Sequence, residues 1–207
     1  MKRACSHFNS QISITYNTFY CGHLPEMVQF AINCGSKGVK IDFCSTIFTN
    51  NKPDSRYMIP PEELAFNVMR DYPKLMEITD GKLVFEMMIP FCLFPREFIE
   101  ELKKKKQITS VCQLKKGKGL IWDEYGNILM CNALFDYPIG HYGTDFTNAE
   151  SLKRWLNSPI VLGYYNRIGA YPSSSCQFCE LYQECGGGCP LRWAIYKPNE
   201  IVKSFTK

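Results

Sequence analysis

The first half of the chain switches between two hydrophobic periods, that of a strand and that of a helix. Residues 11–19 alternate apolar and polar side chains, which predicts a strand. Residues 24–34 repeat apolar side chains at helical spacing, between Pro25, which suits a first turn, and Gly35, which suits a helix end. Residues 38–44 predict a second, buried strand. A strand, a helix and a strand in this order predict a βαβ unit, so we expect an α/β fold with a parallel sheet.

The same alternation continues through the rest of this half. A long helix is predicted to begin at residues 60–63 and to end either before Pro73 or at residues 80–81, because proline inside a helix removes a hydrogen bond. The other elements expected here are a polar loop at 49–57, a strand at 82–89, and a short helix from Pro95 through Leu102 into the lysines at 103–106.

The second half of the sequence has a different character. Residues 119–131 predict a β-hairpin with its turn at 125–127, and residues 148–156 predict a small amphipathic helix. The remainder is rich in Gly, Pro, Cys and Tyr and is expected to be irregular backbone. We therefore predict two domains, a segment of α/β structure at 1–107 and a small α+β domain at 108–207.

The composition is that of an ordinary globular protein. Of the 207 residues, 45% are hydrophobic and 21% are charged, so the chain can bury a sizeable core. The net charge of +4 requires neither nucleic acid nor an anionic membrane as a partner. No apolar segment is long enough to span a bilayer, and the first residues hold no secretory signal, so we expect a cytoplasmic protein.

The cysteine count changes this ordinary picture. Eleven cysteines are many for a chain without an export signal. In a reducing compartment, clustered cysteines bind metal or carry chemistry more often than they form disulfides. Six of them have motif-like spacing in the second half. The other five are scattered and are expected to be mostly small buried residues: Cys5, Cys21, Cys34, Cys44 and Cys92.

The densest cysteines form one array, Cys176-x2-Cys179-x5-Cys185-x3-Cys189. Two cysteines with two residues between them reach one metal from a single tight turn, and thiolate suits zinc and iron–sulfur clusters. Three glycines separate the last two cysteines: Gly186, Gly187 and Gly188. Their backbone can take positive φ and point amide N–H groups at anionic sulfur, so we predict that they help to bind the cofactor.

A further pair of cysteines, Cys112 and Cys131, flanks the predicted hairpin. The hairpin brings the two thiols back toward each other, and Gly126 lies at its turn, where positive φ is expected. Alone, two thiols on a hairpin would be interpreted as core residues. Together with the array, they are predicted to be metal ligands.

The order Cys112-x13-Gly126-x4-Cys131 followed by the array resembles the SPASM domain of radical SAM enzymes, over residues 108–192. That family binds auxiliary 4Fe–4S clusters through such cysteines, with Gly126 in the same motif. The resemblance implies two sets of cluster ligands: Cys112, Cys131 and Cys189 for one, and Cys176, Cys179 and Cys185 for the other. It also implies that the first half consists of late βαβ units of a partial radical SAM-type barrel.

The chain departs from the family at two points. The radical SAM signature Cys-x3-Cys-x2-Cys, whose thiolates hold the cluster that cleaves S-adenosylmethionine, is absent from the sequence. The cysteine that usually follows the position of Cys189 is absent as well, which leaves each set with three ligands. The fourth ligand is expected to be an aspartate, a small molecule or a substrate atom, with Asp123, Asp136 and His141 as candidates by their chemistry and neighbourhood.

The pattern is that of the last part of a family member, shortened at both ends: a gene fragment, one half of a split protein, or a degenerate relative. The family modifies peptides or proteins by radical chemistry. The resemblance therefore implies one or two auxiliary clusters that support electron transfer or substrate binding, an electron donor, and a peptide or protein substrate. S-adenosylmethionine would bind only together with a separately encoded N-terminal half, and we expect no cleavage of it by this chain alone. Whether the chain is itself an enzyme stays open.

Two other functions stay open beside this one. The first is a non-catalytic iron–sulfur electron-transfer module that acts with a separate partner. The second is a zinc-binding interaction domain, although zinc sites usually have two Cys-x2-Cys pairs and this array has one.

Seven lysines lie between residues 103 and 118: those at 103–106 and Lys115, Lys116 and Lys118. Such a stretch usually forms a solvated face, which is what we expect here. A docking patch for an acidic peptide or an electron donor is the alternative.

Overall fold

The computed structural model describes residues 1–110, 112, 114–115 and 120–202. Its centre is a four-stranded parallel sheet in a mixed α/β fold, as the sequence predicts. The strands follow one another in the order β1 (Ile12–Tyr16), β2 (Val39–Phe43), β5 (Leu83–Glu86) and β6 (Ile108–Thr109). All three strand pairs are parallel, with Ile14 opposite Ile41 and Ile41 opposite Phe85.

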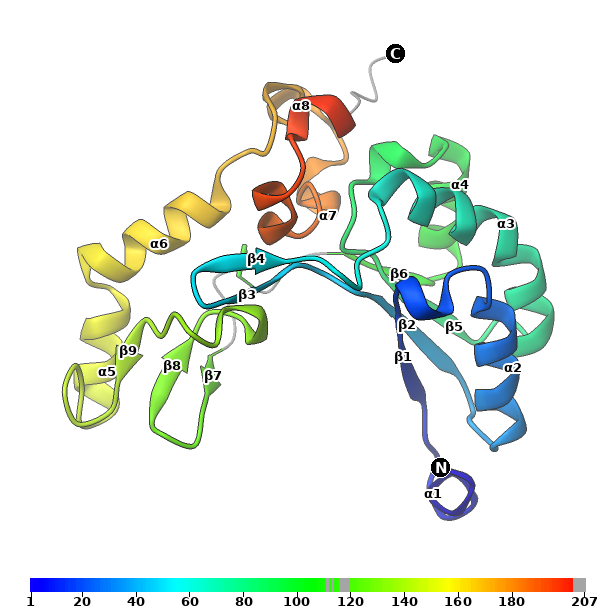
Figure 1. Ribbon diagram of the computed structural model, residues 1–207, viewed down its shortest axis with the longest axis horizontal. Coiled ribbons are helices and arrows are strands. Elements are labelled where there is room, and N and C mark those ends of the chain that lie inside the picture. The colour runs from blue at the N-terminus through cyan, green and yellow to red at the C-terminus, as the bar shows by residue number, and fades with distance from the viewer. Residues whose placement is uncertain (111, 113, 116–119, 203–207) are drawn as a thin grey trace.

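Three helices connect these strands and cover one face of the sheet (Figure 1): α2 (Leu24–Asn33), α3 (Pro61–Thr79) and α4 (Arg96–Lys104). Parallel strands need crossover connections, and crossovers of one hand between sequential strands place every helix on the same face. The longest helix, α3, has 19 residues. Within the described residues, no helix has the length and the apolar character that crossing a membrane requires.

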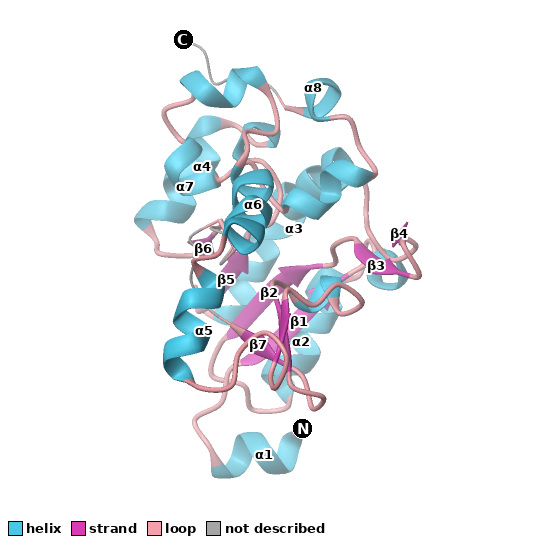
Figure 2. Ribbon diagram, turned by 90° about the vertical axis from the view of Figure 1, so that its left-hand side faces the viewer, coloured by secondary structure: helices cyan, strands magenta, loops and turns pink. Residues whose placement is uncertain are grey.

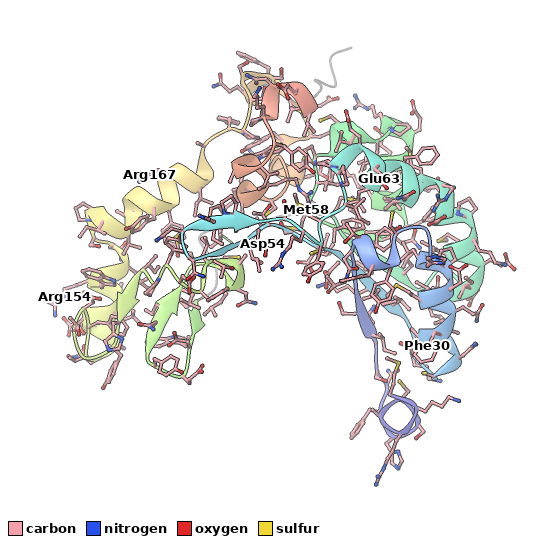
Figure 3. The ribbon with its side chains drawn as sticks, viewed as in Figure 1. Phe30, Asp54, Met58, Glu63, Arg154 and Arg167 are labelled. Atoms are coloured by element: carbon pink, nitrogen blue, oxygen red, sulfur yellow. The ribbon has the colours of Figure 1, made fainter. Side chains whose placement is uncertain are left out.

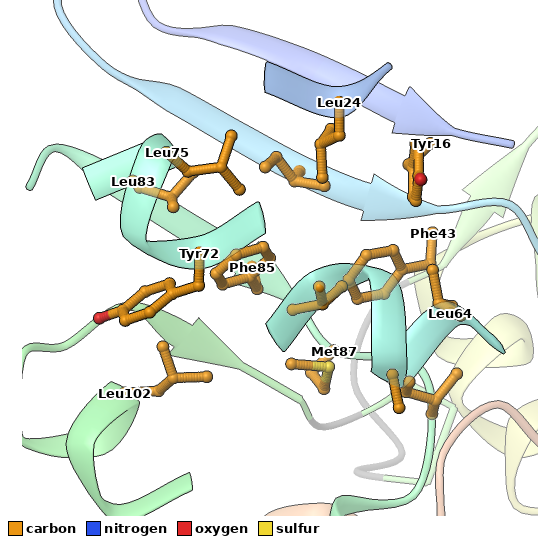
Figure 4. Close-up of a cluster of buried hydrophobic side chains, with 14 of the residues drawn as sticks. Tyr16, Leu24, Phe43, Leu64, Tyr72, Leu75, Leu83, Phe85, Met87 and Leu102 are labelled. Atoms are coloured by element: carbon orange, nitrogen blue, oxygen red, sulfur yellow. The ribbon is translucent and has the colours of Figure 1, made fainter. Parts of the chain in front are cut away.

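The main hydrophobic core lies between the sheet and these helices (Figure 4). Alternate residues of the strands point into it, so Ile41 and Phe85 are fully buried beside Leu64 and Leu75 of α3. Burying such a side chain stabilises the fold by roughly 1.5–3 kcal/mol. The opposite face of the sheet is polar and carries Ser13, Lys40, Asp42 and Glu86.

The structure corrects one prediction and decides another in this half. The expected polar loop at 49–57 contains a β-hairpin, β3 (Ile47–Thr49) paired with β4 (Lys52–Asp54). Its turn is formed by Asn50 and Asn51, both at positive φ, a conformation that asparagine tolerates better than most residues. Helix α3 continues through Pro73 to Thr79, because its apolar face packs on the core along its whole length.

The second half begins with a small antiparallel sheet and two helices. The sheet consists of β7 (Ile121–Trp122), β8 (Asn127–Leu129) and β9 (Gly140–His141), and the helices are α5 (Ala149–Leu156) and α6 (Pro159–Gly169). The predicted hairpin and α5 are therefore confirmed. Helix α6 was not predicted, because its only signals are Ser158, which caps it, and a proline in its first turn.

Short elements complete the chain (Figure 2): α1 (Lys2–His7), η1 (Thr18–Tyr20), η2 (Phe91–Leu93), η3 (Asn132–Leu134), η4 (Ser174–Phe178), α7 (Tyr182–Cys185), η5 (Pro190–Ala194) and α8 (Pro198–Ile201). A second, smaller hydrophobic cluster lies around Ile128 and Val161. Arg154 and Arg167, on α5 and α6, lie on the opposite side of the molecule from Phe30 on α2 (Figure 3). The second region has this cluster of its own, but Leu181 and Cys185 pack into the main core, and β6 extends the parallel sheet just past residue 107.

Candidate metal centre

The end of the cysteine array lies directly against the backbone that follows β5. The Cys189 N–H donates to the Met88 carbonyl (2.9 Å), and the Phe91 N–H donates to Cys185 Sγ (3.2 Å). A Cβ atom at Gly188 would lie 3.0 Å from the Met88 carbonyl oxygen, so only glycine allows this approach. The array is thereby fixed at the carboxyl-terminal edge of the parallel sheet, where α/β proteins usually place their ligands.

The three glycines take the conformation that the sequence predicts. Gly186, Gly187 and Gly188 all have positive φ, between 61° and 77°. The Gly187 backbone forms a hydrogen bond with Cys185, and a Cβ atom on Gly187 would lie 2.6 Å from the Pro172 ring. The loop therefore turns tightly enough to direct an amide at a thiol.

Ion pairs hold the array to α4 from the other side. Arg96 pairs with Glu180, and Lys103 Nζ lies 2.7 Å from Glu184 Oε2. In Figure 1, the short helix α7, which ends at Cys185, lies between α4 and α6. The array thus bridges the two regions of the molecule. Lys103 takes part in this contact, and its side chain is at the same time partly exposed to solvent.

The hairpin places the upstream cysteines. Asp123 organises its turn by accepting hydrogen bonds from the N–H groups of Tyr125 (2.9 Å) and Asn127 (2.8 Å). Gly126 has a φ of 83°, the positive value that the turn requires. Cys112 and Cys131 both pack against the second hydrophobic cluster. Gly126 is therefore a turn residue in this structure, and its predicted part in cofactor binding remains a prediction.

Cys112, Cys131 and Cys189 form what we call group 1. Burial raises the pKa of Cys112, and the Cys189 thiol raises it further, while the Lys115 and Leu114 backbone lowers it. Burial also raises the pKa of Cys131, with Cys189 and Cys112 adding to the effect and the Ala133 N–H, 3.4 Å from Cys131 Sγ, opposing it. The three thiols are thus near enough to interact electrostatically, and amides donate to two of them.

Cys176, Cys179 and Cys185 form what we call group 2. Burial raises the pKa of Cys185, the Phe91 and Gly187 amides lower it, and Cys176 and Cys179 raise it. Burial likewise raises the pKa of Cys176, with the Ser173 backbone lowering it and Cys179 raising it. All three thiols line one small pocket. The assignment of these cysteines to two sets of cluster ligands remains a prediction.

Lys115 contradicts the expectation of a wholly solvated lysine face. Its Nζ donates to the Gly186 carbonyl and to the Tyr182 hydroxyl (3.3 Å), and it lies over the Tyr182 ring. Burial lowers the pKa of Lys115, while thiols of both groups raise it. Lys115 is therefore a half-buried cation facing both groups. Lys116 and Lys118 lie outside the described residues.

Arg192 is the most unusual residue of the site. It is fully buried (0% exposed), and none of its three guanidinium nitrogens has a hydrogen-bond partner among the described residues. Burial lowers the pKa of Arg192, and the Cys189, Tyr196 and Cys44 side chains raise it. A buried cation without an acceptor costs several kcal/mol, so this position favours an anionic group beside it.

The donor set fits an iron–sulfur cluster. Buried thiols that accept amide hydrogen bonds, with cations beside them, are the surroundings that stabilise anionic cluster sulfur. Within the described part of the chain, no three His, Cys, Asp or Glu side chains converge so as to hold a single metal ion. The thiols around a four-iron cube bind at separate corners and stand farther apart than the ligands of one ion.

The three side chains considered for the fourth ligand have other contacts. Asp123 holds the hairpin turn, and the Asp136 carboxylate accepts from the Asn50 N–H (3.0 Å). His141 Nδ1 lies 3.0 Å from Asn127 Oδ1. Within the described residues, no hydrogen bond or ion pair links them to either group of thiols, so their role as ligands remains a prediction.

Sequence reasoning missed Arg192 and Cys44. Arg192 lies between Leu191 and Trp193. Two apolar neighbours alone do not predict that an arginine side chain is buried. Cys44 follows β2 and lies near Arg192, which lowers its pKa against the larger effect of burial.

Comparison with protein-family models, with curated proteins and with solved structures finds no match to this chain.

Proposed function

We propose that this protein binds two 4Fe–4S clusters, one at group 1 and one at group 2, in an auxiliary role within radical-based peptide or protein modification. The observation that carries the proposal is the arrangement of the six thiols. Cys176, Cys179 and Cys185 line one pocket, Cys112 and Cys131 pack against one hydrophobic cluster, and Cys189 acts on the pKa of both of the latter. Backbone amides donate to Cys131 and Cys185. No apolar packing requires that arrangement, whereas anionic sulfur does.

The charges of the site support the same proposal. Lys115 faces thiols of both groups, and Arg192 faces Cys189 of group 1. Three thiolates on a four-iron core already give a net anion, and positive charge nearby lowers the cost of placing that anion in a low-dielectric interior. The two cations would therefore hold the clusters in place electrostatically and raise their reduction potentials.

The fold supports a place for this chain beside the radical SAM enzymes. Sequential parallel strands with all helices on one face are the arrangement of a barrel segment, and not of a doubly wound sheet. We propose that the parallel sheet is part of a radical SAM-type barrel and that the region from the hairpin onward is a SPASM-like domain. The open polar face of the sheet would then face the interior of the barrel.

In this role, the bound clusters would accept or relay single electrons. The protein's own residues would set the conditions for that transfer. Amides of Phe91 and Gly187 orient Cys185, and burial excludes water from Cys176, Cys185 and Cys189. S-adenosylmethionine cleavage would require the Cys-x3-Cys-x2-Cys signature, which these 207 residues do not contain, and the substrate would be a peptide or protein.

Anaerobic reconstitution of the full chain with iron and sulfide tests the proposal. We expect a brown protein with equal amounts of iron and sulfide, broad visible absorbance, and an EPR signal after reduction. Zinc, iron and sulfide are measured on the same sample. A colourless chain that carries zinc and no sulfide would overturn the proposal in favour of a zinc-binding domain.

A further inference from the structure

A fourth cysteine lines the pocket of group 2. The residues that line the pocket include the segment 90–92 and the three cysteines of group 2. Cys92, half-buried in the short helix η2, belongs to this lining. By its position in the sequence Cys92 is one of the scattered cysteines, because it precedes the array by more than eighty residues.

The backbone around Cys92 is fixed by the array itself. The Phe91 N–H donates to Cys185 Sγ (3.2 Å), so the residue before Cys92 already contacts a group 2 thiol. Pro90 restrains the entry to η2, and the Phe94 N–H bonds back to the Phe91 carbonyl (2.9 Å). Cys92 is therefore presented to the pocket by a short, hydrogen-bonded turn.

We infer that Cys92 supplies the fourth thiolate of group 2, an inference that rests on the proposed cluster function. In the loaded chain, the Cys92 thiol would release its proton to solvent, and its thiolate would join Cys176, Cys179 and Cys185 as the fourth protein ligand of the cluster. Group 2 then has four cysteine ligands, the complement of a 4Fe–4S cluster.

The other side chains of the pocket are poorer ligands for iron. Leu181 and Val202 are apolar. Tyr182 is engaged with Lys115, and burial is the main cause that raises the pKa of Tyr182 to about 12, which opposes the phenolate form. Ser175 offers a hard hydroxyl, whereas a cluster iron prefers soft thiolate. Among the described residues that line the pocket, Cys92 is the one additional thiol.

Alkylation of the intact, reconstituted chain tests this inference. Iodoacetamide labelling with and without the cluster, followed by mass spectrometry of peptides, gives a rate for each cysteine. We expect Cys92 to be labelled of the order of tenfold more slowly in the loaded chain, in parallel with Cys176 and Cys179, because an iron-bound thiolate is not nucleophilic. Cys21, whose Sγ lies 3.2 Å from Glu63 Oε1, serves as the control and should react equally in both states.

The outcomes separate this inference from the proposed function. If Cys176 and Cys179 are protected and Cys92 reacts at the same rate with and without the cluster, the fourth-ligand assignment is wrong and the cluster proposal stands. If the chain takes up no iron and sulfide, the proposed function fails, and the assignment of Cys92 fails with it.

Substitution gives an independent readout. In a chain with Cys112→Ser and Cys131→Ser, only group 2 remains to be loaded. Adding Cys92→Ser should convert its four-iron EPR signal into that of a three-iron cluster, with about one quarter of the iron lost. Adding Cys21→Ser instead should change neither signal nor iron content. An unchanged four-iron signal in the Cys92→Ser chain would overturn the inference.

Discussion

The two regions of the molecule are stabilised in different ways. The sheet region buries apolar side chains between β1, β2 and β5 and the helices α2 and α3, and its charged residues lie on the open face. In its described residues, the cysteine region has a smaller core of six buried side chains, with short strands. Its buried polar groups include Arg192, which has no partner among the described residues. The first region is held together by apolar packing, whereas the second holds a buried guanidinium that no described side chain pairs with.

Charged residues show the contrast most directly. On the open face of the sheet, Lys40 pairs with Glu86 and lies 3.5 Å from Asp42, and Ser13 Oγ donates to Asp42 (2.6 Å). In the cysteine region, the guanidinium of Arg192 is buried beside thiols and pairs with no carboxylate in the described chain. A fold rarely keeps such a cation without a bound anion, which is why the cysteine region is the one that implies a ligand.

The largest expected effect belongs to the sheet region. Phe85→Ala removes a fully buried ring from the main core and should lower the free energy of unfolding by about 3–5 kcal/mol, measured by urea denaturation. The loss should be about the same with and without bound iron, because the Phe85 ring packs against Phe43 and Tyr72 in the sheet region. The control is Phe66→Ala on α3, where the side chain is 61% exposed and the change should stay within about 0.5 kcal/mol. A loss of stability that appears only in the loaded chain would contradict the separation of the two regions.

Arg192→Met should have the next largest effect. Whether it raises or lowers the free energy of unfolding should depend on whether the cluster is bound. In the chain without iron, an apolar side chain of similar length replaces an unpaired buried charge, so the free energy of unfolding should rise by about 1–4 kcal/mol. In the loaded chain the gain should shrink or reverse, because the cation then has an anion beside it. The reduction potential of the cluster at group 1 should fall as well, measured by redox titration followed by EPR. A variant that is destabilised in both states would contradict the role given to Arg192.

Glu86→Gln should have the smallest effect, and only through pH. The hydrogen bond with Asp42 and then burial raise the pKa of Glu86, so the folded chain keeps this proton when the unfolded chain has lost it. Wild-type stability should therefore decrease as the pH rises from about 4 through the raised pKa of Glu86. Glutamine cannot lose a proton, so the variant should gain on the wild type over that range, by less than about 1 kcal/mol because the site is partly solvated. Urea denaturation at several pH values measures this, with exposed Glu77→Gln as the control. An identical pH profile for the variant and the wild type would contradict the raised pKa of Glu86.

Much of the fold could be predicted from the sequence because local patterns decide it. The βαβ unit, α4, α5 and the hairpin at 121–129 follow from hydrophobic period and turn residues. The hairpin at 47–54 was missed because its strands are three residues long and its turn has two asparagines in place of Asn-Gly. Helix α6 was missed because its hydrophobic residues are largely exposed and show no clear stripe.

Only the part of the candidate site that follows from the spacing of the cysteines and glycines could be predicted. The six cysteines and the positive φ of Gly126 and of the three glycines follow from the motif. Lys115, Arg192 and Cys92 do not, because each reaches the site by tertiary packing: Lys115 through Gly186, Arg192 through burial beside Cys189, and Cys92 through η2. No local sequence pattern predicts contacts between residues so far apart in the chain.

The central claim is that the six thiols make two separate cluster sites, and iron counting on two double variants tests it most directly. Cys112→Ser with Cys131→Ser removes group 1, and Cys176→Ser with Cys179→Ser removes group 2. Each anaerobically reconstituted variant should hold half the iron and sulfide of the wild type, about four irons per chain in place of about eight. Loss of all iron in either variant, or wild-type iron content in both, would contradict the account.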